Sequence, residues 1–157
     1  MNLDSLDIQI LRALVEDGRK KWADLATDCG VSAPAIADRV RRLEKRGIIE
    51  GYTARLSPVA LGYGLMALIS VTLERPEHRA TLLAFVQSHS AIQECHHVTG
   101  DGDYLLKVRC RSTADLEELI SEELKGLPGI SQTRTAIALS TVKETTALPL
   151  DTDHADS

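Results

Sequence analysis

Residues 32–51 read SAPAIADRVRRLEKRGIIEG, and this stretch decides the fold of the N-terminal part of the chain. Ser32 is a favourable N-cap residue, and Pro34 falls in the first turn, where its missing N–H costs nothing. We therefore expect a helix from about Ala33, which Gly47 ends because glycine is typical just past a helix C-terminus. The stretch predicts one helix, a turn and then an extended segment.

The expected helix has one apolar and one polar face. At about 100° per residue, Ile36, Val40 and Leu43 fall within one narrow stripe, which suits packing against other helices. Residues 32–46 hold five Lys or Arg and two acidic residues, a net charge of +3. An ordinary solvent-exposed helix would also carry such charges. Whether this helix contacts DNA must therefore be judged from the helices that precede it.

Two shorter helical patterns come first, over residues 4–17 and 21–30. The second ends in a glycine turn that leads directly into the polar helix, and helix, turn, helix is a DNA-binding arrangement. The segment 48–56 alternates enough to predict one or two short strands, a wing or a linker strand. We therefore expect a winged helix-turn-helix domain over residues 1–52, which binds double-stranded DNA.

The candidate DNA contacts follow from position on the polar face. Ser32, Pro34, Ala35, Asp38 and Arg42 are expected to face base edges or nearby phosphates. Arg41, Lys45 and Arg46 are expected mainly to neutralise phosphates. Arg39 is also a candidate, but it lies nearer the apolar flank, where a contact within the protein is an equal alternative.

The C-terminal half has a different pattern. After a linker over residues 53–63, period-two stretches alternate with two helical stretches in the order β-α-β-β-α-β over residues 64–145. This order predicts a ferredoxin-like domain, so the fold class is α+β. Residues 146–157 are polar and acidic without periodicity, and we expect a disordered tail.

Composition restricts the function further. Residues 1–56 carry a net charge of +1 and residues 57–157 a net charge of −6. The overall charge of −5 is therefore compatible with a basic helix that contacts DNA, here called the reading helix. Aromatic residues make up 3% of the chain, which disfavours nucleic-acid binding by stacking. The three cysteines form no C-x-x-C pair, and no stretch approaches the roughly 20 apolar residues of a membrane span. We expect a cytoplasmic protein with no membrane contact.

The chain resembles the Lrp/AsnC, or feast-or-famine, family of transcriptional regulators. The resemblance rests on the order and spacing of short motifs along about 140 residues. They are Leu3-Asp4 with Asp7, Ile10 and Leu11; Asp17-Gly18-Arg19; Leu25-Ala26; Ser32 with Arg39-Val40 and Arg42-Leu43; Gly47-Ile48-Ile49; Gly51-Tyr52; and Gly100 with Asp103-Tyr104. It implies a ferredoxin-like domain that senses an amino acid or related small effector and forms a homo-oligomer, from dimers up to octamers.

The resemblance also implies an effector site between subunits, near the loop that joins the second and third strands. Here that loop is Gly100, Asp101, Gly102, Asp103 and Tyr104, joined by Thr133 or Thr135 of the last strand. Its backbone N–H groups could bind a carboxylate, and Asp101 or Asp103 could accept from an ammonium group. Glycine and aspartate are also ordinary hairpin residues, so Asp103 could equally hold the loop or a subunit contact.

Cys95, His96 and His97 invite a metal site, but a strand would point His96 away from the other two. We expect a structural or interface role for them, with no metal and no cofactor. The sequence favours a sequence-specific transcriptional regulator that is not an enzyme. The alternatives are a siroheme-decarboxylase-like enzyme of the same fold, which those histidines keep open, and a chromosome-organising protein with little sequence preference.

Overall fold

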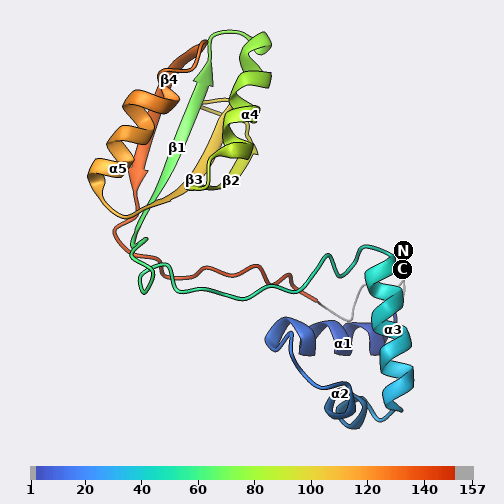
Figure 1. Cartoon of the computed structure of the whole chain (residues 1–157). Helices are drawn as coiled ribbons and strands as arrows, with labels where there is room; N and C mark the ends of the chain where they lie inside the picture. The colour runs from blue at the N-terminus through green and yellow to red at the C-terminus, as the bar shows by residue number, and fades with distance from the viewer. Residues whose placement is uncertain (1–2, 151–157) are drawn as a thin grey trace. The chain divides into compact units, whose positions relative to one another are not determined.

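The computed structural model describes residues 3–150, which form two compact units. The first unit takes in the chain up to Arg55 together with the segment from Glu144 onward, and the second spans Leu56–Lys143 (Figure 1). No helix within residues 3–150 is long and apolar enough to cross a membrane.

Three helices form the first unit: α1 (Ser5–Glu16), α2 (Trp22–Cys29) and α3 (Ala33–Lys45). At the start of α1, Asp4 and Asp7 form a reciprocal capping box. Gly30 ends α2 at φ +67°, and Ser32 Oγ accepts from the Ala35 N–H at 3.4 Å to cap α3. The helix-turn-helix prediction is confirmed.

The apolar stripe of α3 is the centre of this unit's core. Ile36, Val40 and Leu43 are at most 1% exposed and pack against Ile10 of α1 and Leu25 of α2. Burying such a side chain contributes about 1.5–3 kcal/mol. The three helices are therefore held together by the stripe, which leaves the opposite face of α3 in solvent.

The prediction of short strands over residues 48–56 was wrong. No residue between α3 and the first strand, at residue 65, is in a strand, and the chain makes a turn at residues 58–62 instead. The apolar residues Ile48 and Ile49 are half-buried against the helical core. Their alternation is therefore explained by packing, and no neighbouring strand is present to pair with their backbone.

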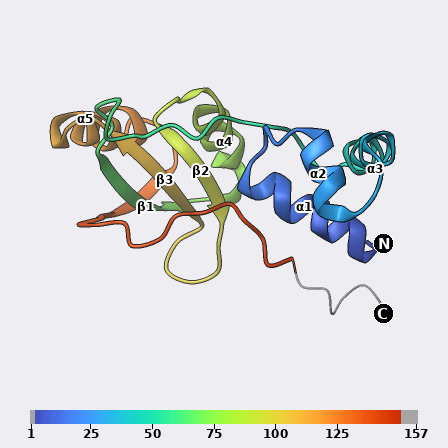
Figure 2. The same ribbon diagram turned by 90° about the horizontal axis from the view of Figure 1, so that it is seen from below.

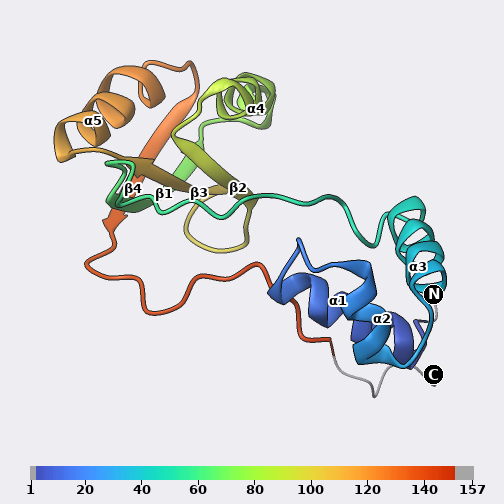
Figure 3. The same cartoon turned by 60° about the horizontal axis from the view of Figure 1, so that its bottom comes forward.

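The second unit is a four-stranded antiparallel sheet of β1 (Leu65–Leu73), β2 (Ile92–His97), β3 (Tyr104–Cys110) and β4 (Ile130–Ile137), in the order β2-β3-β1-β4. A short 3₁₀ turn, η1 (Pro76–His78), leads into α4 (Arg79–Ser88). Helix α5 (Thr113–Glu118) continues as a π-helical segment, η2 (Leu119–Leu124). The predicted β-α-β-β-α-β order is confirmed, with both helices on one face of the sheet (Figure 3).

The side chains of each strand alternate between this helix-covered face and an open face. Ala67, Ile69 and Val71 of β1 are fully buried under the helices, beside Leu106 and Val108 of β3. Leu68 of β1 lies on the open face and is 38% exposed. The period-two pattern in the sequence therefore reflects a sheet with one covered side.

Residues 146–150, the described part of the segment expected to be a disordered tail, form no helix or strand. The Leu150 side chain is half-buried against the core of the first unit. The sequence did not predict the burial of Leu150, because one apolar residue in a polar segment forms no periodic pattern. The remaining residues of the predicted tail, 151–157, lie outside the described part of the chain.

Candidate DNA-binding and ligand-binding sites

The face of α3 opposite the apolar stripe is open to solvent and basic. The exposed members of the candidate set are Ser32, Pro34, Ala35, Asp38, Arg41, Arg42, Lys45 and Arg46. Arg42 Nε lies 3.3 Å from Asp38 Oδ2, an exposed pair one turn apart that contributes little stability. Arg41, Lys45 and Arg46 have no acidic partner among the residues that the structure describes. Their charges are available to DNA phosphates.

Arg39 differs from the other candidates, because its guanidinium is bound within the protein. Its Nη1 donates to Asp7 Oδ1 at 2.9 Å and also to Asp4 Oδ2. The hydrogen bond from Arg39 is the main cause that lowers the pKa of Asp4 below its ordinary value. These contacts tie the middle of α3 to the N-terminal end of α1, so Arg39 adopts the intraprotein alternative.

Asp4 and Asp7 bind Arg39, a structural role that reasoning from the sequence did not assign to them. Asp7 is 8% exposed, and a carboxylate buried this deeply requires a cationic or hydrogen-bonding partner. A signal was present: Asp7 lies four residues before Leu11, on the apolar side of α1. An acidic residue on a buried helix face indicates an ion pair, although it does not identify the partner.

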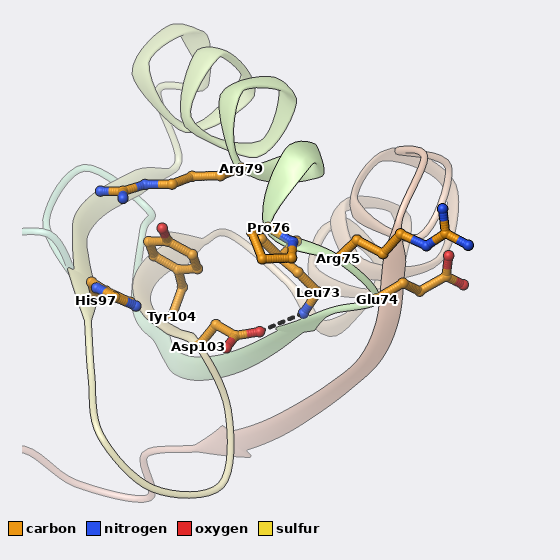
Figure 4. Close-up of a pocket in the computed structure, with 8 residues that line it drawn as sticks. All are labelled: Leu73, Glu74, Arg75, Pro76, Arg79, His97, Asp103 and Tyr104. Atoms are coloured by element: carbon orange, nitrogen blue, oxygen red, sulfur yellow. Dashed lines mark hydrogen bonds between the residues drawn. The ribbon is translucent and has the colours of Figure 1, made fainter.

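The loop between β2 and β3 can be followed in Figure 2, and Asp103 fastens it to the end of β1 (Figure 4). The backbone N–H of Leu73 donates to Asp103 Oδ2 at 2.7 Å, and the N–H of Asp103 donates to the Val71 carbonyl at 2.9 Å. Ser70 Oγ donates to the Asp101 carbonyl at 3.0 Å. Asp103 therefore holds the loop through Oδ2, and no hydrogen bond to its other carboxylate oxygen is formed within the part of the chain that the structure describes.

Replacing Gly102 with alanine should destabilise this loop by about 1–3 kcal/mol. A Cβ at Gly102 would lie 2.2 Å from Ser70 Oγ, and the φ of +147° is one that residues with a side chain rarely adopt. Calorimetric unfolding of the second unit measures the loss. Gly64→Ala is the matched control, because its Cβ would meet nothing within 4 Å. Equal unfolding temperatures for the two variants would contradict the close approach.

A cavity of about 300 Å³ lies beside this loop, between the end of β1, the start of α4 and the end of β2. Its lining comprises Leu73, Glu74, Arg75, Pro76, Arg79, His97, Asp103 and Tyr104 (Figure 4). The His97 and Tyr104 rings stack with centroids 5.0 Å apart. Figure 4 shows Arg79 reaching over these two rings, whereas Arg75 and Glu74 point away from them. The cavity thus combines a cation, a carboxylate and an apolar wall.

Within one chain, the candidate effector residues lie in three separate regions: the cavity, the loop outside it and strand β4. Asp103 and Tyr104 line this cavity, while Gly100, Asp101 and Gly102 belong to the loop outside it, where Asp101 Oδ2 lies 3.5 Å from Arg134 Nη1. Thr133 and Thr135 are on β4, opposite Val71 and Ile69 of β1, and Thr135 lines a separate cavity against α5 and η2. The threonines are therefore not brought to Asp103 within one chain.

Arg79 was not expected in a ligand site, and His97 was considered only as a metal or tetrapyrrole ligand. His97 ends β2 directly before the loop, whereas Arg79 lies at the start of α4, more than 20 residues earlier than Gly100. Only the folded sheet brings these positions together.

The segment Cys95, His96 and His97 alternates as expected for a strand. Cys95 and His97 pair with Leu106 and Tyr104, on the helix-covered face. His96 lies on the other face, where its Nε2 is 3.1 Å from Glu94 Oε2, and Lys107, followed by His96, lowers the pKa of Glu94. Within residues 3–150, no group of three or more His, Cys, Asp or Glu is arranged to hold a metal ion.

Two domain families match the chain almost end to end. The AsnC-type helix-turn-helix domain matches residues 3–44, and the Lrp/AsnC ligand binding domain matches residues 66–148. The leucine-responsive regulatory protein of Haemophilus influenzae is 41% identical over 150 residues, which cover 94% of this chain and 90% of that protein.

Solved structures of two regulators are also similar. A transcriptional regulator of Neisseria meningitidis in complex with L-methionine has a TM-score of 0.92 at 30% identity, with 96% of this chain and 98% of that chain covered. A feast or famine regulatory protein of M. tuberculosis complexed with L-methionine has a TM-score of 0.85 at 34% identity, with 93% and 98% covered. These similarities favour a transcriptional regulator over a siroheme-decarboxylase-like enzyme or a chromosome-organising protein.

Proposed function

The chain belongs to the Lrp/AsnC family of transcriptional regulators, and we propose that it binds specific DNA sites in response to an amino acid. The DNA-binding part of this proposal rests on one observation: α3 has an exposed basic face. Its opposite face is buried against the other helices. Such a helix enters the major groove, where a guanidinium can hydrogen-bond to a guanine edge. Because its proposed partner is DNA, we expect the protein to act in the cytoplasm.

The cavity beside Asp103 supports the second half of the proposal. Arg79 offers a guanidinium for a carboxylate, and the free oxygen of Asp103 offers an acceptor for an ammonium group. Leu73 and Pro76 provide apolar surface for a side chain. A volume of about 300 Å³ suits a ligand of this size. Two relatives were solved with L-methionine, which carries these three groups.

We further propose that the protein acts as a homo-oligomer. The open face of the sheet exposes Leu68 and leaves Met66 and Leu105 half-exposed, as an isologous dimer interface would require. A single reading helix with a charge of +3 binds DNA weakly, and pairing two such helices multiplies the affinity. In an assembly, loop residues 100–102, Thr133 and Thr135 can complete an effector site between subunits.

L-Methionine should raise the thermal unfolding temperature of the wild-type chain, because preferential binding to the folded state adds RT ln(1 + [L]/Kd) to stability. A thermal-shift screen of the amino acids, with L-methionine included, measures this. Arg79→Ala should abolish the shift by removing the carboxylate partner. Arg75→Ala should keep it, because Arg75 points away and lies 3.5 Å from Glu77. A shift retained by Arg79→Ala would contradict the assignment of this cavity.

A further inference from the structure

His97 is the last residue of β2, and its ring lies on the wall of the cavity beside Asp103. The ring stacks on that of Tyr104, its cross-strand partner, with centroids 5.0 Å apart and planes inclined by 26°. Tyr104 is only 3% exposed, so it gives the imidazole a fixed surface to lie on. The backbone is held as well, because the N–H of Val98 donates to the Asp103 carbonyl at 3.0 Å. His97 is therefore positioned at the cavity by both its backbone and its ring.

The ring nitrogens of His97 have no partner within residues 3–150. No hydrogen bond or ion pair joins them to another residue there, and Asp103 binds the Leu73 N–H instead. Arg79 reaches over the same rings and has no acidic partner in this part of the chain (Figure 4). Two side chains that can carry positive charge therefore line one cavity with their donors unused.

Three titratable side chains share the cavity wall with His97 from neighbouring elements: Arg79, Asp103 and Tyr104. Glu74 and Arg75 point away from the stacked rings (Figure 4). His78 is not on the wall, because its ring packs against Gly129. Cys95, on the same face of β2, is half-buried, and burial raises the pKa of its thiol, so it stays neutral near neutral pH. His97 is therefore the one histidine that contributes to this wall.

We propose that His97 in its charged form binds the ligand's carboxylate together with Arg79, so that ligand binding takes up a proton from solvent onto the imidazole. The proposal rests on the proposed amino-acid-binding function. Histidine is the side chain whose charge ordinarily changes between about pH 5 and 8. Two cations that line an empty cavity repel each other, and a bound carboxylate replaces this repulsion with charge-assisted hydrogen bonds. The affinity for the ligand therefore rises as the pH falls.

Isothermal titration calorimetry of the full chain with L-methionine tests this at about pH 6 and about pH 7.5. L-Methionine keeps its carboxylate and ammonium charges over this range, so a change in affinity arises in the protein. Repeating each titration in two buffers of different ionisation enthalpy measures the proton uptake. His97→Gln can hydrogen-bond but cannot become charged, whereas His97→Lys is charged at both pH values. His96→Gln is the matched control, because His96 lies on the other face of β2.

For the wild type and His96→Gln, we expect a Kd about three- to fivefold lower at the lower pH, if the ligand prefers charged His97 about tenfold. Binding should take up a fraction of a proton. His97→Gln should bind more weakly, with one Kd at both pH values and no proton uptake, and His97→Lys should bind tightly at both.

A wild-type Kd that does not change with pH would overturn the proposal, and so would a pH dependence retained by His97→Gln. The wild-type titrations remain decisive if a variant fails to fold, because binding without proton uptake contradicts the role of His97. Absence of L-methionine binding at both pH values would overturn the ligand cavity itself, and this inference with it.

Discussion

Replacing Asp7 with alanine should lower the free energy of unfolding of the DNA-binding unit by about 2–3 kcal/mol. The substitution removes the better-buried partner of Arg39 and leaves a guanidinium whose side chain is only 26% exposed. Breaking one side of a buried ion pair costs more than the pair itself contributes, because the remaining charge stays desolvated. The estimate is below the range for fully buried pairs, since Asp4 still binds Arg39.

Urea unfolding followed by tryptophan fluorescence measures this loss selectively. Trp22, in α2, is the only tryptophan of the chain, so its signal reports the DNA-binding unit. Glu16→Ala removes the same charge from an exposed position on the same helix and should change stability by less than about 0.5 kcal/mol. Coincident unfolding curves for the two variants would show that the Asp7–Arg39 contact does not hold α3 against α1.

Replacing Arg42 with alanine should weaken binding to the preferred DNA site by about 1–3 kcal/mol, or roughly 5- to 150-fold, and relax the base preference at one position. Arg42 is exposed on the reading face, and its 3.3 Å pair with Asp38 is easily exchanged for a base edge. Footprinting on a set of single-base variants of the site measures both effects.

Lys45→Ala provides the contrast, because Lys45 is expected to contact phosphate alone. It should weaken binding to every sequence by the same factor and reduce the salt dependence by about one unit of slope. If Arg42→Ala leaves both the affinity and the sequence preference unchanged, α3 does not read bases through this residue.

Patterns that repeat along one element were visible in the sequence. The stripe of Ile36, Val40 and Leu43 predicted which side of α3 is buried, and the structure confirms it. The period-two stretches likewise predicted the strands of the second unit and their order with the two helices. Both patterns are local, because helix and strand periods fix the direction of each side chain without knowledge of the partner.

Features that depend on two distant segments could not be predicted. The partners of Arg39 lie more than 30 residues earlier in the chain. The ligand cavity joins Arg79, His97 and Asp103 from three elements, and only the sheet register places them together. The strand prediction relied on the apolar residues Ile48 and Ile49, which instead pack against the helical core. Leu150 was missed since one leucine makes no pattern.

The proposal that amino-acid binding in one unit controls DNA binding by the other is tested most directly by titrating the wild-type protein against two labelled duplexes of equal length. One carries the region upstream of its own coding sequence and the other a random sequence, each with and without saturating L-methionine. We predict at least tenfold tighter binding to the upstream duplex and about a 5- to 150-fold change in its Kd with an amino acid. Equal affinity for both duplexes, unchanged by any amino acid, would contradict it.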